Sequence, residues 1–376
     1  MNLRRLSLCA CVLAGLTAAS AGYAQQGTVQ VRPDGSVEVR DAIVPLPALM
    51  SAGAREVLGR TQPTEGPGAP VPPPGDIADM RELRRVYNQN LQPRVDYMRK
   101  AFPVDIVETT IDGIEAAIIT PRGGVPARNA HRLILNGPGG GFRTGVRANG
   151  LLISIPVAAT LGVKVVSILY RQGPEYQFPA ASEDLIKVWN HYLREYPAGN
   201  IGMVGCSAGG SLVSQATAML IQAGKATPGA LGVYCSGLGA VGPGDSAFFS
   251  SLSIANIGAA SASATAPVAP VGAVPVSGAD ARNYYTGVDM QQFIVNPTLD
   301  GKLLAKFPPT IFFTATRDFA MSASAYSNIK LQEAGVPSQI MTFEGLYHGF
   351  MTNPDFPEAR EGYRIAAMFF DRYLGR

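Results

Sequence analysis

Short runs of apolar and β-branched residues alternate with longer amphipathic segments along most of the chain. The runs predict eight strands, over residues 106–110, 116–120, 132–135, 163–170, 201–204, 231–234, 310–314 and 339–343. Apolar positions at helical spacing predict helices over residues 148–161, 180–195, 211–223, 322–334 and 357–374. Near-continuous apolar strands that alternate with helices are typical of a mostly parallel sheet with helices on both faces, which binds ligands at the carboxyl ends of its strands.

The pattern differs before and within this region. Residues 25–102 combine a Pro-rich stretch with two amphipathic segments, which we expect to be helices that lie over an α/β domain at residues 103–376. Between about residues 237 and 308 the alternation is interrupted, and residues 259–278 are a low-complexity Ala/Ser/Val/Pro segment. An insertion of this kind is typically a lid or a surface loop.

Residues 1–24 have the pattern of a secretory signal peptide. Arg4 and Arg5 precede an apolar stretch, and Ala24 ends a cleavage site with small residues. The alternative is a membrane anchor, but the strongly apolar part is shorter than the roughly 20 residues that span a bilayer. We therefore expect an exported protein, periplasmic or secreted, without a stable membrane anchor.

Composition narrows the class of partner. Hydrophobic residues make up 47% and charged residues 16% of the chain, which favours a large core and excludes disorder. The formal net charge is +3, and the leader holds two arginines and no acid, so the mature chain carries +1. This gives no electrostatic reason to expect nucleic acid as a partner. Because only Cys206 and Cys235 follow the leader, a cysteine-rich zinc or disulfide scaffold is excluded.

Ser207 is the candidate nucleophile. It is the centre of a GxSxG pattern that runs from Gly205 to Gly209, directly after a predicted strand and before a predicted helix. A serine on a sharp strand-to-helix turn needs small neighbours, because its backbone is strained and crowded. In a chain this rich in glycine the pattern can arise by chance as an ordinary turn, so its position between strand and helix carries the argument.

A serine nucleophile needs a histidine base that a carboxylate holds in one tautomer. Of the three histidines, His131 opens a strand and His191 lies among charged residues of a predicted helix. His348 follows the last predicted strand, and Asp318 follows the strand before it. The order Ser207, Asp318, His348 at the ends of three late strands therefore predicts a catalytic triad.

The glycines of PGGGF, residues 138–142, follow another predicted strand. Attack on a carbonyl creates an oxyanion, which needs backbone N–H donors that are already in place. Successive glycines let the backbone approach a substrate closely. A flexible loop or a phosphate cradle is the alternative, but no GK[ST] or GxGxxG pattern accompanies the loop. We therefore expect an oxyanion hole.

Five ordered motifs resemble the hormone-sensitive-lipase branch of bacterial esterases: PGGGF, YRQGPEYQFPAASED, GCSAGG, TATRDF and EGLYHGF. The resemblance covers most of the mature chain and implies the α/β-hydrolase fold with a helical cap. It also implies a small-molecule ester as substrate, with short or medium acyl groups, and an acyl-enzyme intermediate that needs no metal and no cofactor.

Residue by residue, the resemblance makes Ser207 the nucleophile, His348 the base and acid, and Asp318 the partner that orients His348. The oxyanion donors that it implies are Gly139, Gly140, Gly141 and Ala208, with Gly140 and Gly141 favoured within the loop. The YRQGPEYQFPAASED segment is structural in this family, and its arginine and acids are expected to brace the loops beneath the site.

Two positions depart from the family pattern. Pro138 stands where the family has a histidine before the glycines, and Cys206 stands where it usually has an aspartate. Cys206 and Cys235 end predicted neighbouring strands, about 4.8 Å apart, within the reach of a disulfide in an oxidising compartment. Two small buried thiols are the alternative that we favour.

The residues do not separate all activities that share this chemistry. An amidase and hydrolases of lactones, carbamates or polyesters use the same triad and oxyanion hole. A non-catalytic binding protein on the same fold is a more distant alternative. Because His348 must be neutral to accept a proton, activity should fall as the pH drops through its pKa, near 6.5 for an ordinary histidine.

Overall fold

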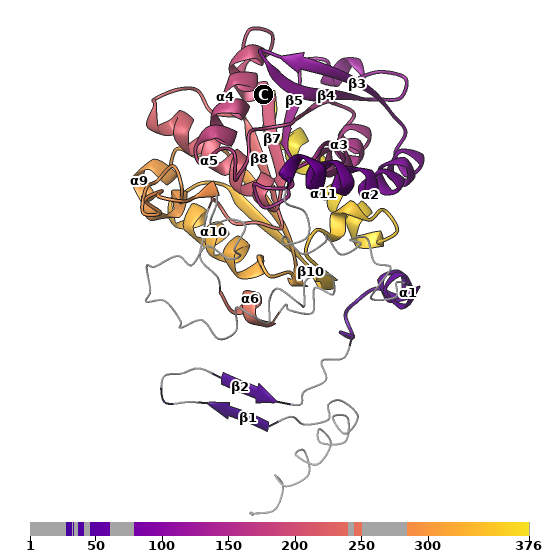
Figure 1. Ribbon diagram of the computed structural model, residues 1–376, viewed down its shortest axis with the longest axis vertical. Helices are drawn as coiled ribbons and strands as arrows, with labels where there is room; N and C mark the ends of the chain where they lie inside the picture. The colour runs from indigo at the N-terminus through magenta and orange to yellow at the C-terminus, as the bar shows by residue number, and fades with distance from the viewer. Residues whose placement is uncertain are drawn as a thin grey trace, which may run out of the picture. The chain divides into compact units, whose positions relative to one another are not determined.

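The structure is a computed structural model that describes residues 28–31, 33, 37–40, 46–60, 79–239, 244–249 and 284–375 (Figure 1). The chain divides into two compact units, Met1–Leu49 and Met50–Arg376. In the first unit, β1 (Thr28–Val31) pairs antiparallel with β2 (Val37–Arg40). We did not predict this pair, although valine alternates with polar residues on both sides of Asp34-Gly35. The expected leader lies outside the described residues.

The second unit is built around an eight-stranded sheet in the order β10-β9-β8-β7-β5-β6-β4-β3. β3 pairs antiparallel with β4 and β4 with β6, whereas all other pairs are parallel. The strands are β3 (Val104–Ile111), β4 (Ile114–Pro121), β5 (Leu133–Gly137), β6 (Lys164–Ile168), β7 (Ile201–Cys206), β8 (Ala230–Tyr234), β9 (Thr310–Arg317) and β10 (Ser338–Tyr347). The mostly parallel eight-stranded sheet predicted from the sequence is confirmed.

Helices cover both faces of this sheet (Figure 1). They are α2 (Met80–Ala101), α3 (Arg147–Leu161), α4 (Ala180–Tyr192), α5 (Ala208–Gln222), α10 (Met321–Glu333) and α11 (Pro357–Tyr373). Alternate strand residues point to opposite faces. Val204 therefore belongs to a buried cluster with residues of α2, α3 and α11, whereas Met203 belongs to a second cluster with residues of α4, α5 and α10. The core thus has two apolar layers, one on each side of the sheet.

The N-terminal helices form as the sequence predicted, with α1 at Ala52–Arg60 and α2 at Met80–Ala101. Asp79 caps α2 by accepting a hydrogen bond from the N–H of Arg81 at 2.9 Å. Both helices belong to the same compact unit as the sheet, so the expected boundary at residue 102 lies within that unit.

The expected insertion at residues 237–308 falls largely on residues 240–243 and 250–283, which are outside the described residues. The described parts of this stretch contain α6 (Asp245–Phe249), a 3₁₀ turn at Pro297–Leu299 and α9 (Gly301–Leu304). Within the described ranges, no helix combines the length and the apolar character that crossing a membrane requires.

Candidate active site

Ser207 lies on a sharp turn between β7 and α5. Its φ of 58° and ψ of −126° are unusual for a residue with a side chain, and its N–H donates to the carbonyl of Tyr234 at 2.8 Å. A Cβ added to Gly205 would lie 2.1 Å from the carbonyl oxygen of Gly209, and one added to Gly209 would lie 1.9 Å from that of Gly137. Only glycine fits at these two positions, which explains the GxSxG pattern.

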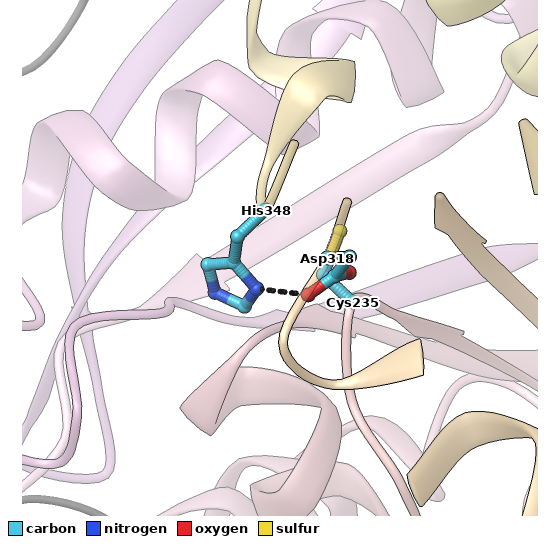
Figure 2. Close-up of side chains that lie close together, drawn as sticks. All are labelled: Cys235, Asp318 and His348. Atoms are coloured by element: carbon cyan, nitrogen blue, oxygen red, sulfur yellow. Dashed lines mark hydrogen bonds and ion pairs between the residues drawn. The ribbon is translucent and has the colours of Figure 1, made fainter. Parts of the chain in front are cut away.

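The structure brings together the three residues that the sequence singled out as a triad. The hydroxyl oxygen of Ser207 lies 2.9 Å from Nε2 of His348. Nδ1 of His348 lies 2.8 Å from Oδ1 of Asp318, the bond drawn in Figure 2. Each residue directly follows a strand, since β7 ends at Cys206, β9 at Arg317 and β10 at Tyr347.

Asp318 is fully buried and is an acceptor at both carboxylate oxygens. Besides His348, Oδ1 accepts from the N–H of Ala320 at 2.9 Å, and Oδ2 accepts from the hydroxyl of Thr314 at 3.1 Å. Burial alone would raise the pKa of Asp318, but the facing His348 and hydrogen bonds from His348, Ala320 and Cys235 outweigh it and hold the pKa below its ordinary value. The carboxylate therefore stays ionised at neutral pH.

The charge of Asp318 acts on His348 in turn. Burial would lower the pKa of His348, but attraction by the Asp318 carboxylate and the hydrogen bond to it outweigh burial and raise the pKa above the ordinary value. With Nδ1 donating to Asp318, Nε2 of the neutral ring is the acceptor that faces Ser207. Nε2 of His348 can therefore accept the proton of the Ser207 hydroxyl.

The glycine loop lies against the Ser207 turn. A Cβ on Gly139 would lie 2.7 Å from the carbonyl oxygen of Cys206 and 3.4 Å from Cβ of Ser207. Gly140 and Gly141 have φ values of 121° and 62°, a region that favours glycine. In the part of the chain that the structure describes, the N–H groups of Gly140 and Gly141 meet no acceptor. They are unused donors in the loop that Gly139 holds against Ser207, and their role in an oxyanion hole stays a prediction.

Ala208, the fourth predicted donor, is the first residue of α5 and directly follows Ser207. The first N–H groups of a helix have no acceptor within the helix, so this position suits an oxyanion donor.

The residues that hold the glycine loop in place could not be recognised from the sequence. The hydroxyl of Tyr170 donates to the carbonyl of Pro138 at 2.8 Å, so the loop start is fixed through the backbone at the position of the missing family histidine. Arg84 of α2 donates to the carbonyls of Arg143 and Gly173, each at 2.7 Å. No sequence pattern links Arg84 with a loop so far along the chain.

Phe142, the last residue of PGGGF, is also held by contacts that the sequence did not reveal. It is buried with a φ of 57°, and its ring stacks on Tyr284 with 4.5 Å between centroids. Tyr284 follows the low-complexity segment, so the two aromatic residues are too far apart in sequence for a local pattern to pair them.

The arginine and the last two acids of the YRQGPEYQFPAASED segment bind one another. The backbone N–H and Nε of Arg171 donate to the buried carboxylate of Asp184 at 2.7 and 2.9 Å. A terminal nitrogen of Arg171 also donates to Glu183 at 3.0 Å. These bonds tie the start of α4 to the chain after β6.

The possible disulfide between Cys206 and Cys235 is not formed, and both residues are free and buried. Strand register pairs Cys206 with Tyr234, which places Cys235 one residue beyond, at a φ of 51°. A hydrogen bond to Cys206, followed by burial, raises the pKa of Cys235 well above its ordinary value, so it stays a thiol. Its Sγ accepts from the N–H of Gly349 at 3.2 Å. The alternative of two buried thiols therefore describes the structure.

Cys235 also lies beside the Asp318–His348 pair (Figure 2). One donor atom from each of these three residues lies within 4.8 Å of the others, and among the described residues they are the one cluster at metal-ligand spacing. In this arrangement Nδ1 of His348 is already hydrogen-bonded to Oδ1 of Asp318. The atoms that would bind a metal are thus those that orient the histidine toward Ser207.

Known proteins that are similar to this chain have the same fold. A family model described as alpha/beta hydrolase fold matches residues 137–352. An acetyl-hydrolase of Streptomyces hygroscopicus is 33% identical over 106 residues, which are 28% of this chain and 36% of that protein. The chain spans only about a third of the length of the first curated relatives that it matches.

Solved structures match over a larger part of the chain. The crystal structure of an esterase E25 is 26% identical, with a TM-score of 0.73, and the match covers 90% of this chain and 99% of that one. An esterase of the bacterial hormone-sensitive lipase family has a TM-score of 0.65 at 19% identity, over 86% and 99% of the two chains, and supports the fold alone.

Proposed function

Because the chain belongs to the alpha/beta hydrolase fold family, we propose that it is a serine hydrolase that cleaves carboxylic esters through an acyl-enzyme intermediate. One observation carries this proposal: the unbroken chain of hydrogen bonds from Ser207 through His348 to Asp318, with distances of 2.9 and 2.8 Å. A binding protein without catalytic function has no need for a strained serine aligned with a histidine and a buried carboxylate.

In the first half of the reaction, the oxygen of Ser207 attacks the ester carbonyl carbon as its proton passes to Nε2 of His348. Asp318 keeps the imidazole in the reactive tautomer and stabilises the imidazolium that forms. The tetrahedral intermediate then collapses, the bond to the alcohol oxygen breaks, and the leaving alcohol takes the proton from His348. The acyl group remains on Ser207.

The negative charge of the intermediate develops on the former carbonyl oxygen. The donors that we propose for this charge are the N–H groups of Gly140 and Gly141, which follow the residue that lies against Ser207, Gly139, and that of Ala208, which follows Ser207 in the chain. Such donors act strongest when they are in place before the reaction, since no reorganisation is then needed.

In the second half, His348 accepts a proton from water, whose oxygen attacks the acyl carbon. Collapse of the second intermediate breaks the bond to Ser207, which regains its proton from His348. The products are a carboxylic acid and the free enzyme, and every proton transfer uses the same imidazole.

Short to medium acyl groups are the substrates that we propose. The similarity to an acetyl-hydrolase supports a small acyl group, and the similarity to the esterase E25 supports an ester as the substrate. Amides, lactones, carbamates and polyesters are alternatives, because their cleavage uses the same groups.

A panel of aryl esters with increasing acyl length, together with matched anilides, tests the activity and its range. We expect turnover of short-chain esters to exceed that of the anilides and to fall by at least roughly 10³-fold in Ser207→Ala. Equal turnover by the two proteins would exclude Ser207 as the nucleophile, and faster anilide than ester cleavage would favour the amidase.

We further propose that the protein is exported to the periplasm or the medium with removal of residues 1–24. Arg4, Arg5 and the small residues that end at Ala24 support this proposal. N-terminal sequencing of the protein recovered from its source cell is the test. We expect a mature chain that begins at Gln25, and an intact Met1 would contradict the proposal.

A further inference from the structure

The side chain of Gln172 is buried and makes both of its hydrogen bonds to one residue. Its Oε1 accepts from the N–H of Gly145 at 2.8 Å, and its Nε2 donates to the carbonyl of Gly145 at 2.8 Å. The amide thus pairs with the backbone of Gly145 as a neighbouring strand would. None of the proposed chemical steps uses Gln172.

Gly145 lies against the residues that carry the oxyanion donors. A Cβ added to Gly140 would lie 2.4 Å from the backbone nitrogen of Gly145, and one added to Gly145 would lie 3.1 Å from the carbonyl oxygen of Gly139. The carbonyl of Gly140 also accepts from the N–H of Thr144 at 2.8 Å. The two ends of the segment 139–145 therefore contact each other, so a contact that fixes the position of Gly145 also fixes that of Gly140.

The chain around Gln172 contacts this loop elsewhere as well. The hydroxyl of Tyr170 binds the carbonyl of Pro138 at the loop start, and the N–H of Gly173 donates to the carbonyl of Phe142 at 2.8 Å. Gln172 supplies the bonds at the other end of the loop. Among these three residues, Gln172 is the one that both accepts a hydrogen bond from the loop and donates one to it.

We propose that Gln172 is a positioning residue that sets the oxyanion donors Gly140 and Gly141 through Gly145. This proposal rests on the proposed function. Without the amide, the buried N–H and carbonyl of Gly145 lose their partners, and the loop must shift to satisfy them. Oxyanion donors work only within a few tenths of an ångström of their place, so such a shift weakens transition-state binding and leaves substrate binding intact.

Gln172→Leu tests this role, with Gln177→Leu as the matched control because Gln177 lies in the same segment and is exposed. Turnover is measured per active site, counted by the burst of alcohol released on acylation. We expect kcat of Gln172→Leu to fall roughly 10- to 100-fold, less than or equal to the effect of removing one oxyanion donor, with KM within about threefold of the wild type. Gln177→Leu should match the wild type.

A trifluoromethyl ketone separates positioning from general damage to the fold. The oxygen of Ser207 adds to its carbonyl carbon, the hydroxyl proton passes to His348, and the ketone oxygen becomes an oxyanion. We expect its inhibition constant for Gln172→Leu to rise by the same factor by which kcat falls. A loss of kcat with an unchanged inhibition constant would overturn the proposal, as would wild-type kcat per active site.

If Gln172→Leu does not fold, Gln172→Glu allows the same comparison of kcat with inhibitor affinity. The glutamate keeps the shape of the side chain and an acceptor for the N–H of Gly145, but it loses the N–H donor for the carbonyl of Gly145. We expect kcat and inhibitor affinity to fall together, and unchanged values would refute the role of Gln172. The proposed function fails separately, if wild type and Ser207→Ala turn over esters equally. Wild-type behaviour of both Gln172 variants in a Ser207-dependent enzyme would overturn only the positioning role.

Discussion

The imidazole of His348 stacks on the ring of Phe319, with 4.1 Å between the ring centroids and 25° between the planes. Phe319 directly follows Asp318, so one short segment after β9 supplies both the carboxylate at the edge of the imidazole and the aromatic ring over its face. The two contacts together fix the plane in which His348 reaches Ser207.

Loss of this stack should lower activity without affecting the triad hydrogen bonds directly. We expect Phe319→Ala to reduce kcat about 2- to 10-fold, because aromatic pairs contribute about 0.5–1.5 kcal/mol beyond their buried area. Steady-state kinetics on a short-chain ester is the measurement. Tyr326→Ala serves as the control, because Tyr326 is an exposed aromatic residue of the following helix, α10. Equal kcat in wild type and Phe319→Ala would show that the stack does not orient His348.

The centre of the sheet could be predicted because its inner strands are buried on both faces. β7 and β8 are buried at every position, so their sequences are nearly continuous apolar runs bounded by turns. Element ends were less accurate. α5 begins at Ala208 and not at the predicted Ser211, since Gly209 and Gly210 hide the helical pattern of its first turn. β9 likewise ends at Arg317 and not at the predicted residue 314, because its last residues are less apolar than the buried run before them.

The candidate triad could be predicted because each member directly follows a strand, and strand ends gather at one edge of a parallel sheet. Arg84 and Gln172 could not be found in this way. Their partners are backbone groups of the glycine loop, and any polar side chain of suitable length can make such bonds. Only the folded chain shows which polar residues reach the loop.

The pH dependence of activity should reflect the environment of His348. Its pKa is raised above the ordinary value, so the imidazole becomes protonated, and inactive as a base, at a higher pH than an isolated histidine would. We therefore expect kcat/KM to fall with decreasing pH with a midpoint above about 6.5. Asp318→Asn removes the charge that raises this pKa and should shift the midpoint down, with kcat reduced roughly 10³- to 10⁴-fold.

The measurement for this prediction is kcat/KM for one aryl ester between pH 5 and 9, on wild type and Asp318→Asn. A flat profile between pH 5 and 8 would contradict the role of His348 as base. A wild-type midpoint below that of Asp318→Asn would contradict the proposed action of the carboxylate.

The two buried cysteines should remain thiols in the purified protein. We expect a maleimide to label neither Cys206 nor Cys235 in the native state, because both are buried, and to label both after denaturation without reductant. Peptide mass mapping of the labelled protein is the readout. Protein denatured after prior reduction is the control, and labelling that appears only in this control would show that the two cysteines are joined by a disulfide.

The most direct test of the account is to trap the acyl-enzyme and locate it. Rapid acid quench of the enzyme mixed with excess p-nitrophenyl acetate, followed by peptide mass mapping, should find one acetyl group on the peptide that contains Ser207. Ser207→Ala should carry no acetyl group at the corresponding peptide, and an early burst of p-nitrophenol should accompany acylation of the wild type. Ester turnover with no acetylated Ser207, or acetylation that persists at another residue in Ser207→Ala with activity retained, would contradict the account.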